Sequence, residues 1–134
     1  MKINEYQLYE MTGALQRLQM QDLKGPMRYA IARNLQVMTP LLNATLEAFP
    51  YPENAKKFQA WRKDLESRNI EIQVFMLPGP PDVDDQVFAA GLRKQRAEGK
   101  RGDPITSLTD EQIEFQRRAR NMAIFDAIMP LIEG

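Results

Sequence analysis

Apolar side chains recur at steps of three and four residues along the first fifty positions of the chain. Before the first set, Asn4 stands where a helix would be capped, with Gln7 three residues later. The first set comprises Leu8, Met11, Leu15 and Leu18. The second set follows a turn at residues 24–26 and comprises Ile31, Leu35, Met38, Leu42, Leu46 and Phe49. Since this spacing places apolar side chains on one helix face, residues 1–49 are predicted to form an antiparallel helical hairpin.

Pro40 lies inside the second apolar stripe. A proline in a helix interior removes one backbone hydrogen bond, and its ring clashes with the carbonyl four residues earlier. We therefore expect the second helix to be kinked after Thr39 or split in two there.

The periodicity changes within residues 52–77. A third helix is predicted from Glu53 to Ser67, with Phe58, Trp61 and Leu65 on one face. From Ile70 to Met76 apolar and polar residues alternate, which is typical of a β-strand. This region is therefore predicted to be a helix followed by a strand.

A lone strand needs a hydrogen-bonding partner, because unpaired buried backbone groups are costly. Within the chain the best partner is the short stretch Ile105–Leu108, so a small intramolecular β-pair is favoured. Two alternatives stay open: the strand lies along the helices, or it pairs with another chain. In the last case Ile72 and Val74 are candidate partner-binding residues.

The final part of the chain begins with a proline-rich link within residues 78–108. A short helix from Asp85 to Gln95 and a basic loop follow, and a C-terminal helix is predicted over residues 109–133. From Met122 onward this helix is apolar nearly all round, which indicates burial in the core or contact with another chain, and burial is favoured. The whole chain of 134 residues is thus predicted to be a single, mainly α domain with one short strand or a small β-pair.

Composition narrows the chemistry that the chain can perform. It contains no Cys and no His, which excludes thiol nucleophiles, thiolate or imidazole metal ligands and the usual catalytic triads. An enzyme would depend on carboxylate, Lys, Tyr or hydroxyl groups, so catalysis is not the expected function. Eighteen basic and eighteen acidic residues give a formal net charge of zero, which argues against a dedicated polyanion binder.

One segment concentrates positive charge, and its basic residues are Arg93, Lys94, Arg96, Lys100 and Arg101. Three interpretations remain open: contact with an acidic protein surface, contact with nucleic-acid phosphates, and a solvated loop. No aromatic residue interleaves them to stack on bases, so nucleic acid is the weaker binding hypothesis. It would also use Arg117, Arg118 and Arg120. The Arg101-Gly102-Asp103 tripeptide is interpreted as a coincidence.

Asp82, Asp84 and Asp85 place three carboxylates within four residues. They resemble a fragment of a Mg²⁺ or Ca²⁺ site, but the glycine and the terminal Glu of a calcium loop are missing. Acidic residues are also favoured at a helix N-terminus, and this is the preferred explanation. No metal and no cofactor is predicted.

Several stretches together resemble a pattern in small uncharacterised accessory proteins of tailed phages and prophages. They are M-K-I-N-E-Y-Q-L, the block L-K-G-P-M-R-Y-A-I-A-R-N-L with Tyr29, Ile31, Arg33 and Asn34, the region Tyr51–Ile72, and the ending I-F-D-A-I-M-P-L-I-E-G. The chain departs from the pattern at Asp85–Thr106, which looks like an insertion and includes the basic segment. The resemblance implies a phage origin and a helical accessory protein, and it transfers no site residues.

No apolar run is long enough to span a bilayer, and the N-terminus lacks the apolar stretch of a signal peptide, so the host cytoplasm is the expected location. The function expected from the sequence is non-enzymatic, stoichiometric binding to a host or phage protein, or self-association. Such a protein would be a virion assembly factor or an inhibitor of a host or defence complex. The alternative is a nucleic-acid-binding regulator that uses the basic segment 93–101.

Overall fold

The computed structural model describes residues 1–133 and confirms a mainly α fold with a small antiparallel β-pair. Its elements, in chain order, are β1 (Lys2–Asn4), α1 (Glu5–Gln19), α2 (Gly25–Ala48), α3 (Ala55–Glu66), β2 (Asn69–Glu71), α4 (Gln86–Glu98), the 3₁₀ turn η1 (Pro104–Ser107) and α5 (Asp110–Glu133).

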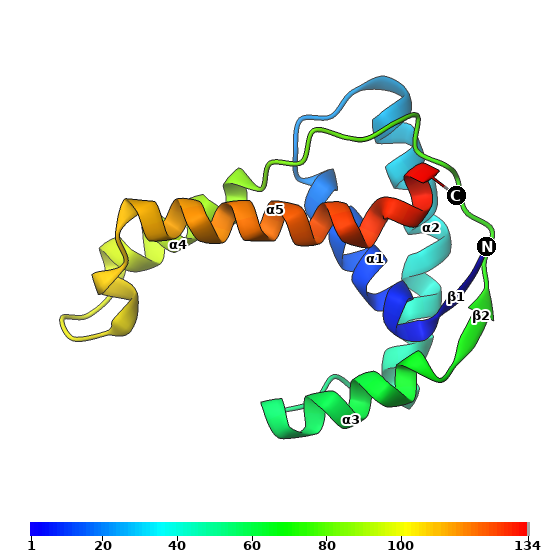
Figure 1. Cartoon of the computed structure of the whole chain (residues 1–134), viewed down its shortest axis with the longest axis horizontal. Coiled ribbons are helices and arrows are strands. Elements are labelled where there is room, and N and C mark those ends of the chain that lie inside the picture. Colours follow the sequence, from blue (N-terminus) through cyan, green and yellow to red (C-terminus); the bar gives the residue numbers. More distant parts are fainter. Residues whose placement is uncertain (134) are drawn as a thin grey trace.

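Helix α1 lies at the centre of the molecule and contacts α2, α3 and α5 (Figure 1). It begins with the predicted capping box: the Asn4 side chain accepts from the Gln7 amide at 2.7 Å, and the Gln7 side chain accepts from the Asn4 amide at 2.9 Å. Its apolar stripe is buried against α2 and against the second half of α5. The main core comprises, among others, Leu8, Met11, Leu15, Leu18, Ile31, Met38, Ile124, Ile128 and Leu131.

Helix α2 is a single helix that contains Pro40, so the predicted split does not occur. Pro40 and Gln36 are both exposed. The Gln36 carbonyl, which lacks its usual amide partner four residues later, can therefore bond to water.

The predicted pairing of the strand with Ile105–Leu108 is wrong, because that stretch forms the 3₁₀ turn η1 and the loop after it. β2 instead pairs with β1, and Ile70 lies opposite Ile3. The strand is also shorter than predicted, since regular pairing ends at Glu71. Beyond it the buried Asn34 side chain takes the place of a partner strand, because it accepts from the Phe75 amide at 2.8 Å and donates to the Phe75 carbonyl at 2.7 Å.

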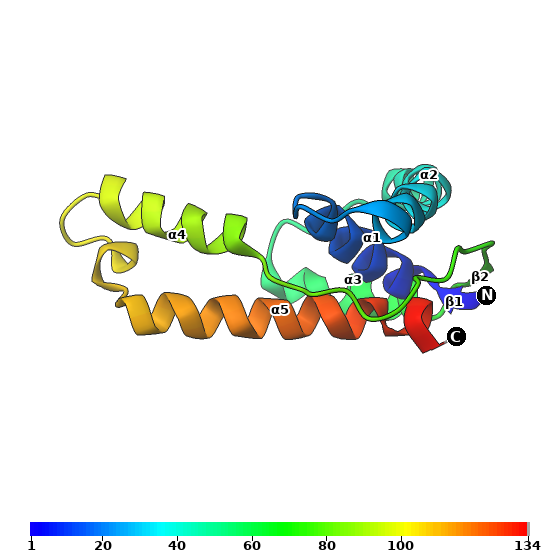
Figure 2. The same cartoon turned by 90° about the horizontal axis from the view of Figure 1, so that it is seen from above.

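Helix α4, η1 and the first half of α5 form a two-helix arm that projects from the body (Figures 1 and 2). Ala89 and Ile113 are buried between its elements. Helix α4 begins after Asp85 as predicted, but it continues to Glu98, three residues past the predicted end. The arm and α3 both project to the same side of the α1–α2 body, with α3 below the arm in the view of Figure 1.

Candidate functional site

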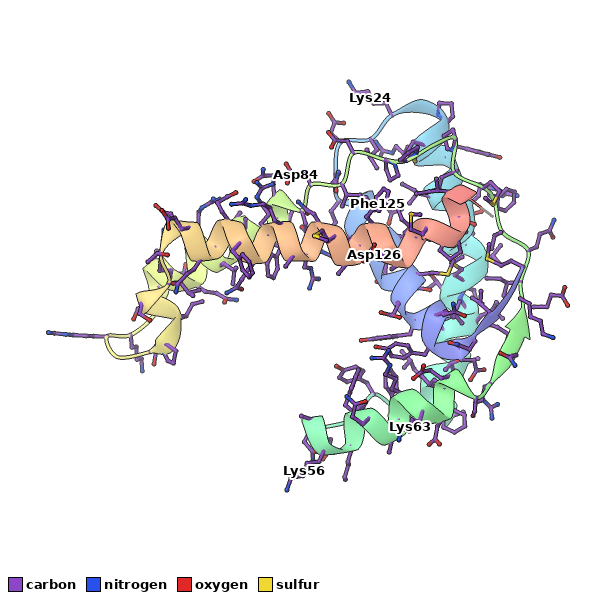
Figure 3. The ribbon with its side chains drawn as sticks, viewed as in Figure 1. Lys24, Lys56, Lys63, Asp84, Phe125 and Asp126 are labelled. Carbon is purple, nitrogen blue, oxygen red and sulfur yellow. The ribbon has the colours of Figure 1, made fainter. Side chains whose placement is uncertain are left out.

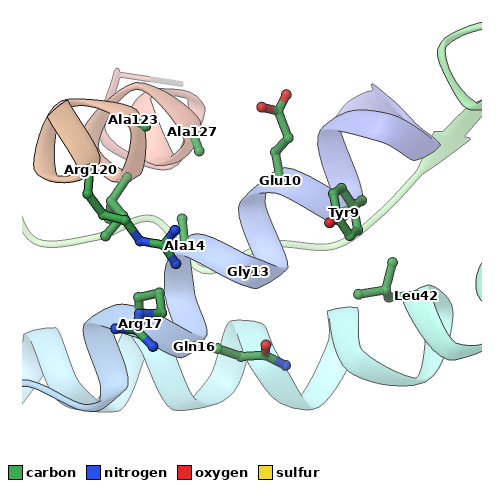
Figure 4. A pocket seen from close by; sticks show the side chains of 11 residues that line it. Tyr9, Glu10, Gly13, Ala14, Gln16, Arg17, Leu42, Arg120, Ala123 and Ala127 are labelled. Carbon is green, nitrogen blue, oxygen red and sulfur yellow. The ribbon is translucent and has the colours of Figure 1, made fainter. Parts of the chain in front are cut away.

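An open groove of about 410 Å³ runs between α1, α2 and α5 (Figure 4). Helix α1 contributes most of its lining, α5 contributes a second wall, and α2 contributes one side chain. The lining residues are Tyr9, Glu10, Gly13, Ala14, Gln16, Arg17, Leu42, Arg120, Ala123, Ile124 and Ala127.

Small side chains line both the α1 and the α5 side of the groove. Gly13 and Ala14 on α1 lie near Ala123 and Ala127 on α5 (Figure 4). A Cβ added at Gly13 would have no atom of the chain within 4 Å. Glycine in a helix interior is about 1 kcal/mol less favourable than alanine. Packing within the chain therefore does not explain why position 13 is a glycine. The space beside Gly13 is free for another molecule.

Aromatic side chains extend the apolar surface from the groove towards α3. The Tyr9 ring, on the groove wall, lies 5.1 Å from the Trp61 ring and 6.0 Å from the Tyr51 ring, between centroids. Trp61 is buried, and its indole N–H donates to the Phe49 carbonyl at 2.9 Å. Tyr51, by contrast, is 55% exposed. A second hollow of about 480 Å³ continues along Tyr51 and Phe58.

The Tyr9 hydroxyl stays protonated over the physiological pH range. Burial of this hydroxyl, and then the neighbouring Tyr51 hydroxyl, raise the pKa of Tyr9 to about 12. The phenol therefore offers a neutral hydrogen-bonding group on the groove wall.

A buried carboxylate binds two of the arginines that line the groove. Asp85 is 2% exposed and receives two hydrogen bonds from Arg17, at 2.8 and 2.7 Å, and a longer one from Arg120 at 3.4 Å. It also caps α4 by accepting from the Phe88 amide at 3.0 Å. Burial opposes ionisation of Asp85, but the bonds and charges of these partners outweigh it, so its pKa lies below the ordinary value.

A second ion-pair cluster lies beside the first. Arg117 of α5 bonds to Asp84 and to Glu114, the latter at 2.7 Å. Hydrogen bonds from Gln86 and then Arg117 lower the pKa of Asp84. The first cluster joins α1, the start of α4 and α5, and the second joins α5 to the link before α4. Together they hold the base of the arm against the body.

The basic segment predicted to bind a partner is distributed over the far end of the arm. Arg93 pairs with Glu114 at 3.0 Å, and Arg96 pairs with Asp110 at 2.8 Å. Lys94, Lys100 and Arg101 are exposed, and within residues 1–133 they form no ion pair. Of the five basic residues predicted to bind a partner, three therefore carry a positive charge that no acidic side chain of the described residues neutralises.

The two strand residues predicted as partner contacts lie elsewhere. Ile72 is buried in the core, and its backbone bonds to Met1 at 2.8 Å in both directions. Val74 is half-buried and packs against the same core. Neither side chain lies on the arm or in the groove.

Asp82, Asp84 and Asp85 do not converge as metal ligands would. Within the described part of the chain no group of three or more acidic side chains is arranged to hold a metal ion. The role of Asp85 as the N-cap of α4 agrees with the preferred explanation of this cluster. None of the helices in residues 1–133 combines the length and apolarity that crossing a bilayer requires.

Sequence reasoning did not find the groove residues Tyr9, Gly13, Arg17 and Ala123. One signal in the sequence could have indicated the groove: Gly13 lies inside a helix with a regular apolar stripe, where a glycine is unusual. Its meaning depends on α5, which is more than a hundred residues away in the sequence. Comparisons with family models, with curated proteins and with solved structures found no match to this chain.

Proposed function

We propose that the protein acts by stoichiometric binding of an apolar segment of another protein in the groove between α1 and α5. The observation that carries this proposal is the groove itself, whose apolar floor of small side chains is left uncovered. A slot between two helices is a common seat for a partner helix or for the apolar side chains of a loop.

Two further features support binding rather than catalysis. The sequence offers neither Cys nor His. Asp85 is engaged by Arg17 and Arg120, two lining residues, so Glu10 is the one carboxylate among the residues that line the groove. The exposed Tyr51 lies beside the groove wall, and aromatic side chains of this kind are enriched at protein interfaces. The phage-like pattern of the sequence favours a partner from virion assembly, or from a host or defence complex.

Affinity capture from bacterial lysate with paired glycine variants tests the proposal. Gly13→Gln places a neutral, helix-favouring side chain in the groove. Gly91→Gln makes the same change in α4, where an added Cβ also has no atom of the chain within 4 Å. We expect a protein captured by the wild type to be retained by Gly91→Gln and reduced at least tenfold with Gly13→Gln. Equal capture by both variants, or no specific capture by the wild type, would contradict the proposal.

Nucleic-acid binding by the arm is the competing outcome. A basic arm that bound phosphates would bind duplex DNA at low salt and lose affinity steeply as salt is raised. Replacing Lys94, Lys100 and Arg101 by Ala would then weaken binding, whereas Gly13→Gln would leave it unchanged.

A further inference from the structure

The outer face of α5 exposes two large apolar side chains, with polar side chains beside them. Phe115 is 71% exposed and Met122 is 67% exposed, the highest values among the large apolar side chains of the described residues. Helix α5 lies along one edge of the molecule, and α1, α2 and α4 are all on its other side (Figure 2). The opposite face of the same helix supplies Ile113, Ile124, Ile128 and Leu131 to the interior. This helix therefore has two apolar faces, of which the chain covers one.

The uncovered face follows a seven-residue repeat. Phe115, Met122 and Met129 are seven residues apart, and Arg118 and Phe125 fall between them; Phe125 and Met129 are half-buried and the other three are exposed. Steps of three and four residues on one face are the pattern by which two helices pack along each other. We call this set, together with Asp126, the α5 stripe; Phe125 and Asp126 are labelled in Figure 3.

The α5 stripe is complementary to itself when a second copy runs antiparallel. If the two helices cross at Met122, residues equally far from Met122 on either side face each other. Phe115 then meets Met129 of the second copy, and Arg118 meets Asp126. Both Arg118 and Asp126 are exposed, and neither forms an ion pair within residues 1–133.

A parallel arrangement in the same register is disfavoured by charge. It would place Arg118 against Arg118 and Asp126 against Asp126, and like charges across a helix pair oppose association. The antiparallel arrangement instead forms two opposite-charge pairs on either side of an apolar centre. Charge therefore selects both the orientation and the register.

We propose that two copies of the chain associate through the α5 stripe, antiparallel, about a two-fold axis at Met122. The contact spans the fourteen steps from Phe115 to Met129, about 21 Å of helix. A contact confined to one helix face belongs to the small class of interfaces, so association is expected at about 10–100 µM.

Sedimentation over a range of concentrations tests the association, with two matched glutamate variants. Met122→Glu places two like charges at the two-fold axis and is expected to weaken dimerisation at least tenfold. Met20→Glu makes the same change at the end of α1, where Met20 is 53% exposed, and is expected to dimerise like the wild type. A wild type that is monomeric up to about 1 mM, or a Met122→Glu variant that dimerises unchanged, would overturn the proposal.

Charge exchange tests the register. Arg118→Glu and Asp126→Arg are each expected to weaken self-association, because each variant alone puts like charges together. An equimolar mixture of the two variants forms complementary pairs at both sites, so a heterodimer of wild-type affinity is expected. A dimer that the single variants leave unchanged, or that the mixture does not restore, would refute this antiparallel register.

The dimer and the groove are tested by different substitutions. Gly13 is on α1 and outside the α5 stripe, so Gly13→Gln is expected to leave dimerisation unchanged. Failure of either proposal therefore leaves the other standing.

Discussion

Replacing Asp85 is expected to destabilise the fold more than any other substitution in the ion-pair clusters. Its carboxylate is almost completely buried and bonds to Arg17, Arg120 and the Phe88 amide at the same time. Asp85→Ala removes all of these bonds. It leaves the guanidinium of Arg17 without its partner and the first turn of α4 without its cap.

The magnitude follows from these contacts. Removing one member of a buried ion pair costs about 3–5 kcal/mol, and losing a helix cap about 1 kcal/mol. The Arg17 side chain is 25% exposed and can be partly rehydrated, which brings the loss from the broken ion pair down to about 2 kcal/mol. We therefore expect Asp85→Ala to lower the free energy of unfolding by about 3 kcal/mol in total, and Asp85→Asn, which can keep the cap, by about 2 kcal/mol.

Urea denaturation followed by circular dichroism measures this loss. With a slope of about 2 kcal/mol per molar urea, a loss of 3 kcal/mol lowers the midpoint by about 1.5 M. Asp84→Ala is the control, because Asp84 is 39% exposed and its replacement should cost about 1 kcal/mol or less. If Asp85→Ala and Asp84→Ala lowered the midpoint equally, the account of Asp85 as the anchor of the arm would be refuted.

Three further predictions concern stability. The pKa values of Asp84 and Asp85 are lowered in the folded state, so the stability that these carboxylates contribute is present above the unfolded value of about 3.9 and is lost as pH falls through the folded pKa. The difference in unfolding free energy between wild type and Asp85→Ala should therefore shrink below about pH 4. A difference that grew as pH fell would contradict this sign. Gly13→Ala should raise the unfolding free energy by about 0.5–1 kcal/mol, because alanine is the better helix residue and meets no atom of the chain; a lowered melting temperature would be the contrary result. Asn34→Leu should lower the free energy of unfolding measured by urea titration by about 2–3 kcal/mol, because it leaves the Phe75 backbone N–H and carbonyl without hydrogen-bond partners. The control Gln36→Leu, on the exposed side of α2, should lower it by less than about 0.5 kcal/mol.

Local sequence signals were sufficient to predict the helices. The Asn4 cap predicted the start of α1 correctly, and the acidic residues Asp82, Asp84 and Asp85 indicated the N-terminus of α4, because both signals act over only a few residues. The split of α2 that Pro40 could have caused does not occur, and the sequence alone does not show that Pro40 lies on the exposed side of the helix.

Features that depend on distant residues were not predictable. The strand partner is β1, three residues at the beginning of the chain that are too short to show an alternating pattern. Asp85 meets Arg17 across 68 positions, and the groove needs α1 and α5 at the correct packing angle. Apolarity all round α5 indicated burial or contact with another chain, and the structure shows burial on one face only.

Site-specific photo-crosslinking at the groove tests the central claim most directly. The sequence contains no Cys, so Gly13→Cys and Gly91→Cys each provide one site for a benzophenone label. In bacterial lysate the account predicts that the label at position 13 gives a discrete heterologous product, distinct in mass from a dimer of the 15.5 kDa chain, and that the label at position 91 does not. The same products from both positions, or none from position 13, would contradict binding in the groove.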